Sequence, residues 1–316
     1  MTILMILGGL VLLFLGGEAL VRGAVGIAKL LKLSTMVTGV VIVGAATSMP
    51  ELVASVQAAL QGSPGLAWGN IVGSNIANAL LILGATALLV PFALGGTGKR
   101  DAVMGLAAVL ALAVIAWFEW ASLAIGLALL AALVAYIFWR VAHPRKADLD
   151  ADLDADRDAD PVEDYAPARP LPAIAFFAVG VAMLVLGGNW LVTGATDLAR
   201  TLGVSETAIG LTIVAIGTSL PELAASLVAA LRGQPGLALG NVVGSNVFNL
   251  LLIGGTTMAI APQPIPHELL DVEWGVLAAS ALALVLLCGV AKRMGRGLGA
   301  LFLAAFAANT ALVFAA

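Results

Sequence analysis

The 316-residue sequence contains few charged side chains, since Asp, Glu, Lys and Arg together make up only 11% of it. Soluble domains carry about a quarter charged residues. Because 61% of the residues are hydrophobic, the chain cannot cover a water-facing surface, which excludes a soluble globular enzyme. Aromatic residues are also scarce, at 6%. The Ala, Leu, Val and Gly that dominate instead are typical of closely packed membrane helices.

Cysteine and catalytic motifs are missing as well. Cys288 is the only cysteine, so no intrachain disulfide or thiolate metal site can form. The sequence shows no nucleophile–base pair, no phosphate loop and no nucleic-acid-binding signal, so we expect no enzyme and no catalytic residues. The first apolar run starts at Ile3 without a basic stretch before it. We therefore expect a retained membrane span and no cleavable signal peptide.

What the chain does contain is a series of apolar runs, each near the roughly 20 residues that a spanning helix needs. They predict an all-α polytopic membrane protein with ten transmembrane helices, at about 3–31, 36–60, 66–93, 102–118, 121–140, 172–200, 207–231, 236–261, 272–290 and 297–315.

Basic residues fix the orientation of these spans. With the N-terminus outside, 14 of the 15 lysines and arginines lie at or near the cytoplasmic side, and only Arg200 lies outside. Cytoplasmic loops carry the excess of Lys and Arg in membrane proteins. The sequence therefore predicts a multi-pass protein of the cell (inner) membrane, with both termini external.

The two halves of the chain repeat each other. Residues 47–84 and 218–255 are identical at 26 of 38 positions without a gap, and 171 positions separate Glu51 from Glu222 as well as Gly16 from Gly187. The predicted domains are a first transmembrane repeat (1–140), an acidic cytoplasmic linker (141–171) and a second repeat (172–316). Five spans per repeat insert the halves upside down relative to each other, a pattern typical of secondary transporters.

The acidity of the chain belongs to the linker. The net charge is −4, but residues 148–164 alone hold nine acids and one base. An EF-hand-like loop could start at Asp152, yet Arg157 stands where that loop needs glycine. We interpret the segment as a solvated linker, with loose regulatory Ca²⁺ binding as the alternative.

Two glutamates stand inside predicted spans, where ionisable groups mark functional sites by default. Glu51 and Glu222 are each the last residue of the pattern T-S-x-P-E. In a helix the preceding hydroxyls share the face of their own carboxylate, namely Thr47 and Ser48 for Glu51, and Thr218 and Ser219 for Glu222. Pro50 and Pro221 bend these helices and free carbonyl oxygens.

A second motif, G-N-x-V-G-S-N-x-x-N, follows in each half and places Ser74 before Asn78 and Ser245 before Asn249. Together with the glutamates these residues predict an all-oxygen cage with a formal charge of about −2, suited to one Ca²⁺ or two Na⁺. The lack of His and Cys argues against Zn²⁺ or Cu⁺. The alternative is that protonated glutamates, and serine or asparagine hydrogen bonds, merely hold helices together.

The motifs GAATSMPE with GNIVGSNIAN, and GTSLPE with GNVVGSNVFN, resemble the two repeats of the cation/calcium antiporter superfamily, which includes the sodium/calcium exchangers. The resemblance implies ten helices in two inverted repeats and exchange of Ca²⁺ for Na⁺ by alternating access. It also implies that the first and sixth spans slide across the other eight, through glycines such as Gly16, Gly17, Gly23, Gly187, Gly188 and Gly194.

Carried over to this sequence, the resemblance makes Glu51 and Glu222 the shared Ca²⁺ and Na⁺ ligands. Oxygen donors would come from Thr47, Ser48, Ser74, Asn78, Thr218, Ser219, Ser245 and Asn249. No cofactor is implied beyond the transported ions. Several sodium/calcium exchangers carry an aspartate at the position of Asn78 or Asn249, usually in the second repeat, where this chain has Asn249. That difference leaves stoichiometry, K⁺ co-transport and H⁺ as the driving ion open. Ca²⁺/H⁺ exchange is therefore the first alternative, and a cation channel is the alternative from another class.

Three further features have competing interpretations. Glu18, inside the first span, is either a cation relay or an interior hydrogen-bond partner. Asp197 and Arg200 are expected to pair on the helix surface. The tryptophans are interpreted mostly as interfacial anchors, at positions 68, 117, 120, 139, 190 and 274.

Overall fold

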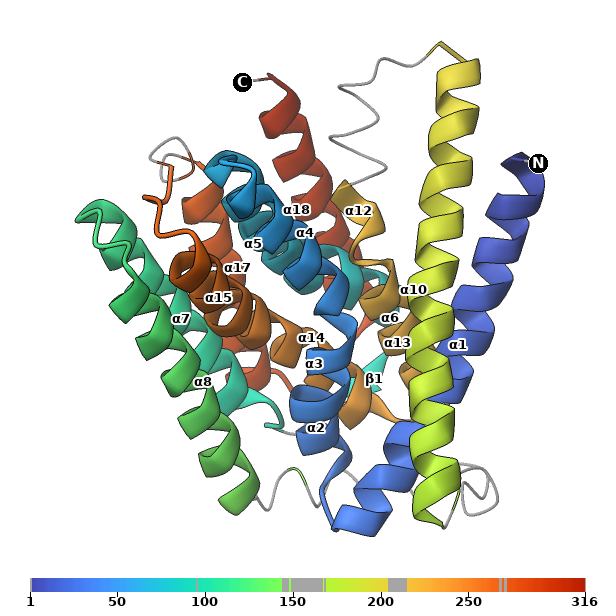
Figure 1. Cartoon of the computed structure of the whole chain (residues 1–316). Coiled ribbons are helices and arrows are strands. Elements are labelled where there is room, and N and C mark those ends of the chain that lie inside the picture. The colour runs from blue at the N-terminus through green and yellow to red at the C-terminus, as the bar shows by residue number, and fades with distance from the viewer. Residues whose placement is uncertain are drawn as a thin grey trace.

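The computed structural model describes residues 2–94, 96–143, 148, 167, 169–203, 215–266, 269 and 272–315. Helices account for most of them (Figure 1), as the sequence predicts. Within these ranges the only strands are β1 (Phe92–Ala93) and β2 (Arg293–Met294), which pair antiparallel. Most of the predicted linker, including Arg157 and the acids after Asp148, lies outside the described residues.

The first half of the chain forms five consecutive helical stretches, two of which are interrupted. Their elements are α1 (Thr2–Leu31); α2 (Thr35–Thr38), the π-helical η1 (Gly39–Val43), α3 (Gly44–Thr47) and α4 (Met49–Leu60); α5 (Pro64–Ile76), the π-helical η2 (Ala77–Ile82) and α6 (Leu83–Leu89); α7 (Lys99–Trp117); and α8 (Leu123–Ala142).

The second half follows the same order. Its elements are α10 (Pro170–Thr201); α12 (Ala215–Gly217) and α13 (Leu220–Leu231); α14 (Pro235–Phe248), the π-helical η5 (Asn249–Ile253) and α15 (Gly254–Ile260); α17 (Glu273–Val290); and α18 (Arg296–Ala315). The start of α1 and the end of α18 lie at the same end of the molecule (Figure 1).

Nine of the ten predicted spans have a counterpart among the described residues. Eight stretches are long and apolar enough to cross a membrane, and the pair Thr35–Thr47 and Met49–Leu60, bent by 44°, makes a ninth. The predicted span 207–231 is described only from Ala215 onward, because residues 204–214 fall outside the described ranges. The tenth span remains a prediction.

The interior of the molecule is formed by the third stretch of each half. In the most apolar windows of Pro64–Leu89 and Pro235–Ile260, 78% and 94% of the residues are buried, against 28% in α1 and in α10. The two halves interlock here because glycines let backbones touch. A Cβ at Gly39 would lie 2.6 Å from the Leu237 carbonyl oxygen, and one at Gly244 would lie 2.5 Å from that of Val40.

α1 and α10 lie side by side along their lengths (Figure 1). A Cβ added at Gly23 would come within 2.3 Å of the Phe177 backbone nitrogen, and one at Gly180 within 2.3 Å of that of Leu20. Gly16, Gly187 and Gly194 make similar contacts between these two helices. The expectation that these six glycines form sliding contacts with the other eight spans is therefore wrong for four of them, which join α1 to α10.

Only one repeat-related pair of these glycines faces another part of the bundle. Gly17 contacts Val228 of α13, and Gly188 lies 3.8 Å from the Pro221 ring, measured from added Cβ atoms. At these two positions the α1–α10 pair contacts α13, the helix that carries Glu222.

Candidate cation-binding site

Both glutamates lie in the first turn of a helix that begins after a break. α3 ends at Thr47, Ser48 adopts φ −78° and ψ 3°, and α4 then starts with Pro50 in its first turn. Ser219 has nearly the same backbone angles before Pro221 and α13. Proline lacks an N–H and suits the first turn of a helix. The T-S-x-P-E sequence thus ends one helix and starts the next, which fixes each carboxylate at the break.

The carboxylates lie deep in the molecule and close to one another. Glu51 is 1% exposed and Glu222 is fully buried, and the charge of Glu51 acts directly on Glu222. Oε2 of Glu51 and both carboxylate oxygens of Glu222 have no hydrogen-bond partner among the described residues. Buried anionic oxygens without a partner are costly. A bound cation or proton would remove that cost.

The hydroxyl groups of Thr47, Ser48 and Ser219 lie near the carboxylate of the opposite repeat. Ser219 Oγ donates to Glu51 Oε1 at 3.4 Å. The hydroxyls of Thr47 and Ser48 lie near Glu222 without forming a hydrogen bond to it. The expectation that they share a helical face with their own glutamate is wrong, because the helix is broken between them. The two repeats therefore both contribute to the candidate site.

Further oxygen atoms come from the interlocked helices α3 and α14. Thr47 Oγ1 lies 3.1 Å from Asn241 Oδ1 and 3.4 Å from Ser245 Oγ. Ser245 is fully buried, and Ser74 is 4% exposed at the equivalent place in the other half. Thr218 is half-buried. All ten predicted residues are thus described, and every one except Thr218 is buried.

Asn78 and Asn249 lie where the third stretch of each half turns π-helical, in η2 and η5. π-helical turns are frequent at functional sites. Both side chains are buried, and neither amide has a hydrogen-bond partner among the described residues. Their carbonyl oxygens are therefore available as ligands.

One unpredicted feature is the same in both halves. Asn70 donates to Ser55 Oγ at 2.9 Å and to the Glu51 carbonyl oxygen at 3.3 Å. Asn241 makes the same two bonds, to Ser226 and to the Glu222 carbonyl oxygen, at 2.9 and 3.2 Å. We call these two asparagines the clamp. Their identity in the aligned repeats was the signal that could have revealed them.

The donor set is rich in oxygen and poor in acids. Among the described residues no group of three or more His, Cys, Asp or Glu side chains is placed to hold a metal ion. Two carboxylates surrounded by hydroxyl and amide oxygens are the hard ligands that Ca²⁺ accepts.

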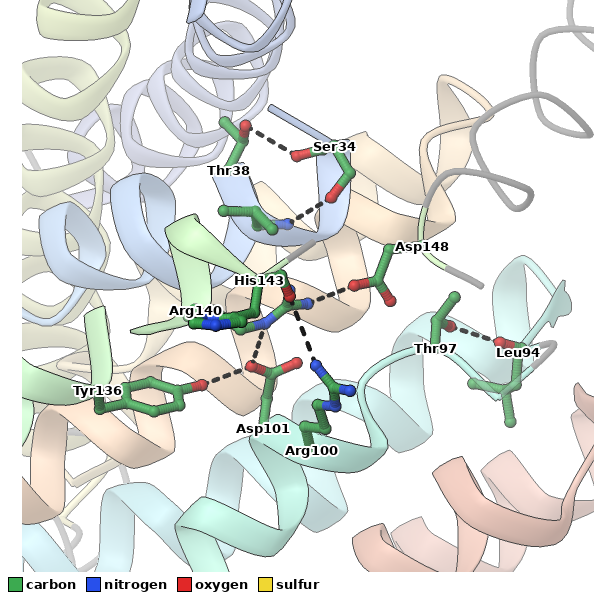
Figure 2. A network of polar contacts seen from close by, with 11 residues as sticks. Ser34, Thr38, Leu94, Thr97, Arg100, Asp101, Tyr136, Arg140, His143 and Asp148 are labelled. Atoms are coloured by element: carbon green, nitrogen blue, oxygen red, sulfur yellow. Dashed lines mark hydrogen bonds and ion pairs between the residues drawn. The ribbon is translucent and has the colours of Figure 1, made fainter. Parts of the chain in front are cut away.

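A buried ion network that was not predicted from the sequence lies elsewhere, near the end of α8 (Figure 2). Arg140, expected at the cytoplasmic side, is fully buried. Its guanidinium donates to Asp101 at 2.7 Å and to Asp148 at 2.6 Å, and Tyr136 donates to the same Asp101 oxygen at 2.5 Å. Asp148, the first acid of the linker, is thereby fixed to the helix bundle.

The remaining features have mixed outcomes. Glu18 is half-buried; it accepts from Arg232 at 2.7 Å and pairs with Arg22. The two arginine side chains are 45% and 39% exposed, so Glu18 is a hydrogen-bond partner but not an interior one. Asp197 and Arg200 pair as predicted, at 3.8 Å. Two tryptophans are not interfacial anchors: Trp68 is buried against Gly254, and Trp274 is buried with its indole donating to Val109.

Residues 1–142 and 172–315 match the family model described as sodium/calcium exchanger protein. The chain belongs to this family. Within it, CaxA of Alkalimonas amylolytica, provisionally named an antiporter, is 38% identical over 98% of this chain and 97% of its own. The sodium/calcium exchanger MaX1 of Methanosarcina acetivorans is 32% identical over 98% of both chains.

A solved structure of another exchanger has the same architecture. The sodium-calcium exchanger NCX_Mj, soaked with zero Na⁺ and Ca²⁺, superposes on 99% of this chain and 98% of its own, with a TM-score of 0.82 and 29% identity. The chain is therefore a membrane-spanning cation antiporter of the exchanger family, a transporter and not a member of an enzyme class.

Proposed function

We propose that the protein exchanges Ca²⁺ for Na⁺ by alternating access, at a single site centred on Glu51 and Glu222. The observation that carries the proposal is the pair of buried carboxylates with unpartnered oxygens and with no described basic side chain bound to them. One Ca²⁺ or two Na⁺ would balance their charge. The names of MaX1 and NCX_Mj support the same ion pair.

We further propose ten transmembrane helices in two inverted five-helix repeats, with both termini outside the cell membrane. Three observations support this topology. Repeat-related residues make the same contacts in both halves, as the clamp does. The π-helical turns η2 and η5 occupy equivalent positions. The first and last helices have their free ends at the same end of the molecule (Figure 1).

The direct ligands in this proposal are the two glutamates, with Thr47, Ser48, Ser74, Asn78, Thr218, Ser219, Ser245 and Asn249 as oxygen donors. Protons compete at such a site, because protonating both carboxylates also removes the charge of about −2. Ca²⁺/H⁺ exchange is therefore the specific alternative, and it differs only in the driving ion.

The test is Ca²⁺ uptake into sealed proteoliposomes loaded with Na⁺, compared with vesicles that have only a pH gradient. We expect uptake to require the Na⁺ gradient. Uptake that follows the pH gradient and ignores Na⁺ would establish the proton-coupled alternative. Single-channel currents would contradict an antiporter.

Variants locate the site in the same assay. Glu51→Gln and Glu222→Gln should each weaken Ca²⁺ transport at least about tenfold, because a bond involving an ionised group contributes about 1.5–3 kcal/mol. Glu119→Gln removes an exposed glutamate between α7 and α8 and serves as the matched control. Wild-type transport by both site variants would contradict the proposed site.

A further inference from the structure

A groove between α7 and α8 lies away from the cation site. These two helices lie at one edge of the bundle (Figure 1). The groove has a volume of about 780 Å³ and opens to the outside of the molecule. Its floor is formed by small and apolar side chains, namely Val103, Met104, Ala107, Ala132 and Ala135.

One end of this groove is basic and aromatic. Lys99 and Arg100 begin α7, and Trp139 lies near the end of α8. The Arg100 guanidinium carbon lies 5.4 Å from the Trp139 ring centroid, and Arg100 also donates to the His143 carbonyl oxygen at 3.4 Å. These contacts hold Arg100 in place at the mouth of the groove.

The positive charge at this end is not balanced within the described part of the chain. No described carboxylate lies within 4.0 Å of the Lys99 or Arg100 side chains. Both residues also occupy the first turn of α7, where the helix dipole is positive and cations are disfavoured. Two basic side chains and the amide groups of a helix start would together attract an anion.

We propose that the groove binds an anionic phospholipid, with its phosphate at Lys99 and Arg100 and one acyl chain along the apolar floor. From Lys99 to Ala107 the helix rises about 12 Å, close to the roughly 15 Å of hydrocarbon in one leaflet. Basic pockets between membrane helices bind anionic headgroups, and Trp is enriched at the same depth. The inference does not depend on which ion drives exchange.

Lipid binding here would also stabilise the fold. Tyr136 lines the groove and donates to Asp101 of the buried Arg140 network. An acyl chain against the Tyr136 ring would restrict the ring and keep water away from that network. We therefore expect bound anionic lipid to raise the thermal unfolding midpoint.

The experiment measures lipid binding to the purified, delipidated full chain by native mass spectrometry, with phosphatidylglycerol and phosphatidylcholine compared. We expect the wild type to prefer phosphatidylglycerol. Lys99→Ala/Arg100→Ala should weaken that binding about 25-fold, from about fivefold for each basic residue at an anionic headgroup. Lys29→Ala/Lys32→Ala, which removes two exposed charges at the end of α1, should leave the preference unchanged.

A second variant tests the contribution of the apolar groove separately from that of the basic residues. Ala107→Phe fills the exposed floor without removing a basic residue and should also reduce bound phosphatidylglycerol. The proposal is overturned if the wild type binds both lipids equally, or if the control pair loses the preference as much as the groove pair. It is also overturned if Ala107→Phe binds phosphatidylglycerol as the wild type does.

Discussion

Replacing the clamp residue Asn241 by alanine should impair Ca²⁺ handling more than the same change at its repeat mate Asn70. Asn241 is 1% exposed and makes three contacts, to the Glu222 carbonyl oxygen, to Ser226 and to Thr47. Asn70 is half-buried and makes two equivalent hydrogen bonds, to the Glu51 carbonyl oxygen and to Ser55. Although the two asparagines are equivalent in the repeats, their different contacts predict a larger effect for Asn241→Ala than for Asn70→Ala.

The magnitude follows from these contacts. Each buried hydrogen bond contributes about 0.5–1.5 kcal/mol, and a buried partner left unpaired costs more. Groups that orient a metal ligand change metal affinity about 10- to 100-fold when they are removed. Asn241→Ala should therefore raise the half-saturating Ca²⁺ concentration about 10- to 100-fold. Asn70→Ala should raise it by about tenfold or less, because water can replace the lost donor at a half-buried position.

The assay is Na⁺-driven Ca²⁺ uptake in proteoliposomes over a range of Ca²⁺ concentrations. Size-exclusion profiles and thermal unfolding midpoints show whether each variant is folded. Ser226→Ala removes only one of the Asn241 bonds and should give an intermediate shift. The reasoning is refuted if folded Asn241→Ala protein keeps the wild-type half-saturating concentration, or if Asn70→Ala has the larger effect.

Two further predictions concern stability and are measured by thermal unfolding in detergent. Arg140→Ala should destabilise the protein by about 3–5 kcal/mol, because it leaves two buried aspartates without their cation, whereas Arg200→Ala, at an exposed pair, should cost at most about 1 kcal/mol. A small effect of Arg140→Ala would show that water reaches the network. Gly180→Ala should cost about 1–3 kcal/mol through overlap with the α1 backbone, while Gly275→Ala, with no described atom within 4 Å of its added Cβ, should be neutral. Equal midpoints for the two glycine variants would contradict the close packing of α1 and α10.

Features that occur in both halves could be predicted from the sequence, because aligning the two repeats shows which residues they share. Glu51 and Glu222 were identified since an acid, its hydroxyls and a proline recur 171 positions apart, and the structure buries both acids. The span boundaries follow from apolar runs alone. The family was identified from the same two motifs.

Features that depend on how the two halves face each other could not be predicted. Local spacing assigned Thr47 and Ser48 to Glu51, but the helix break directs them to Glu222. The glycines of the first and sixth spans were expected to contact the other eight spans, but most of them pack α1 against α10. Arg140 resembled an ordinary cytoplasmic cation, because its partner Asp148 belongs to an acidic segment that seemed fully solvated from its composition.

The close contact between α1 and α10 has a consequence for biosynthesis. α1 leaves the ribosome before α10, and its glycine face is shaped to fit that later helix, which begins at Pro170. Until that helix is made, small residues that pack well only against another backbone face lipid or incomplete neighbours. Domains generally fold from the N-terminus as they are synthesised, but the pairing of α1 has to wait for the second half of the chain. A fragment containing the first half alone is therefore expected to insert its helices while leaving α1 without its main packing partner.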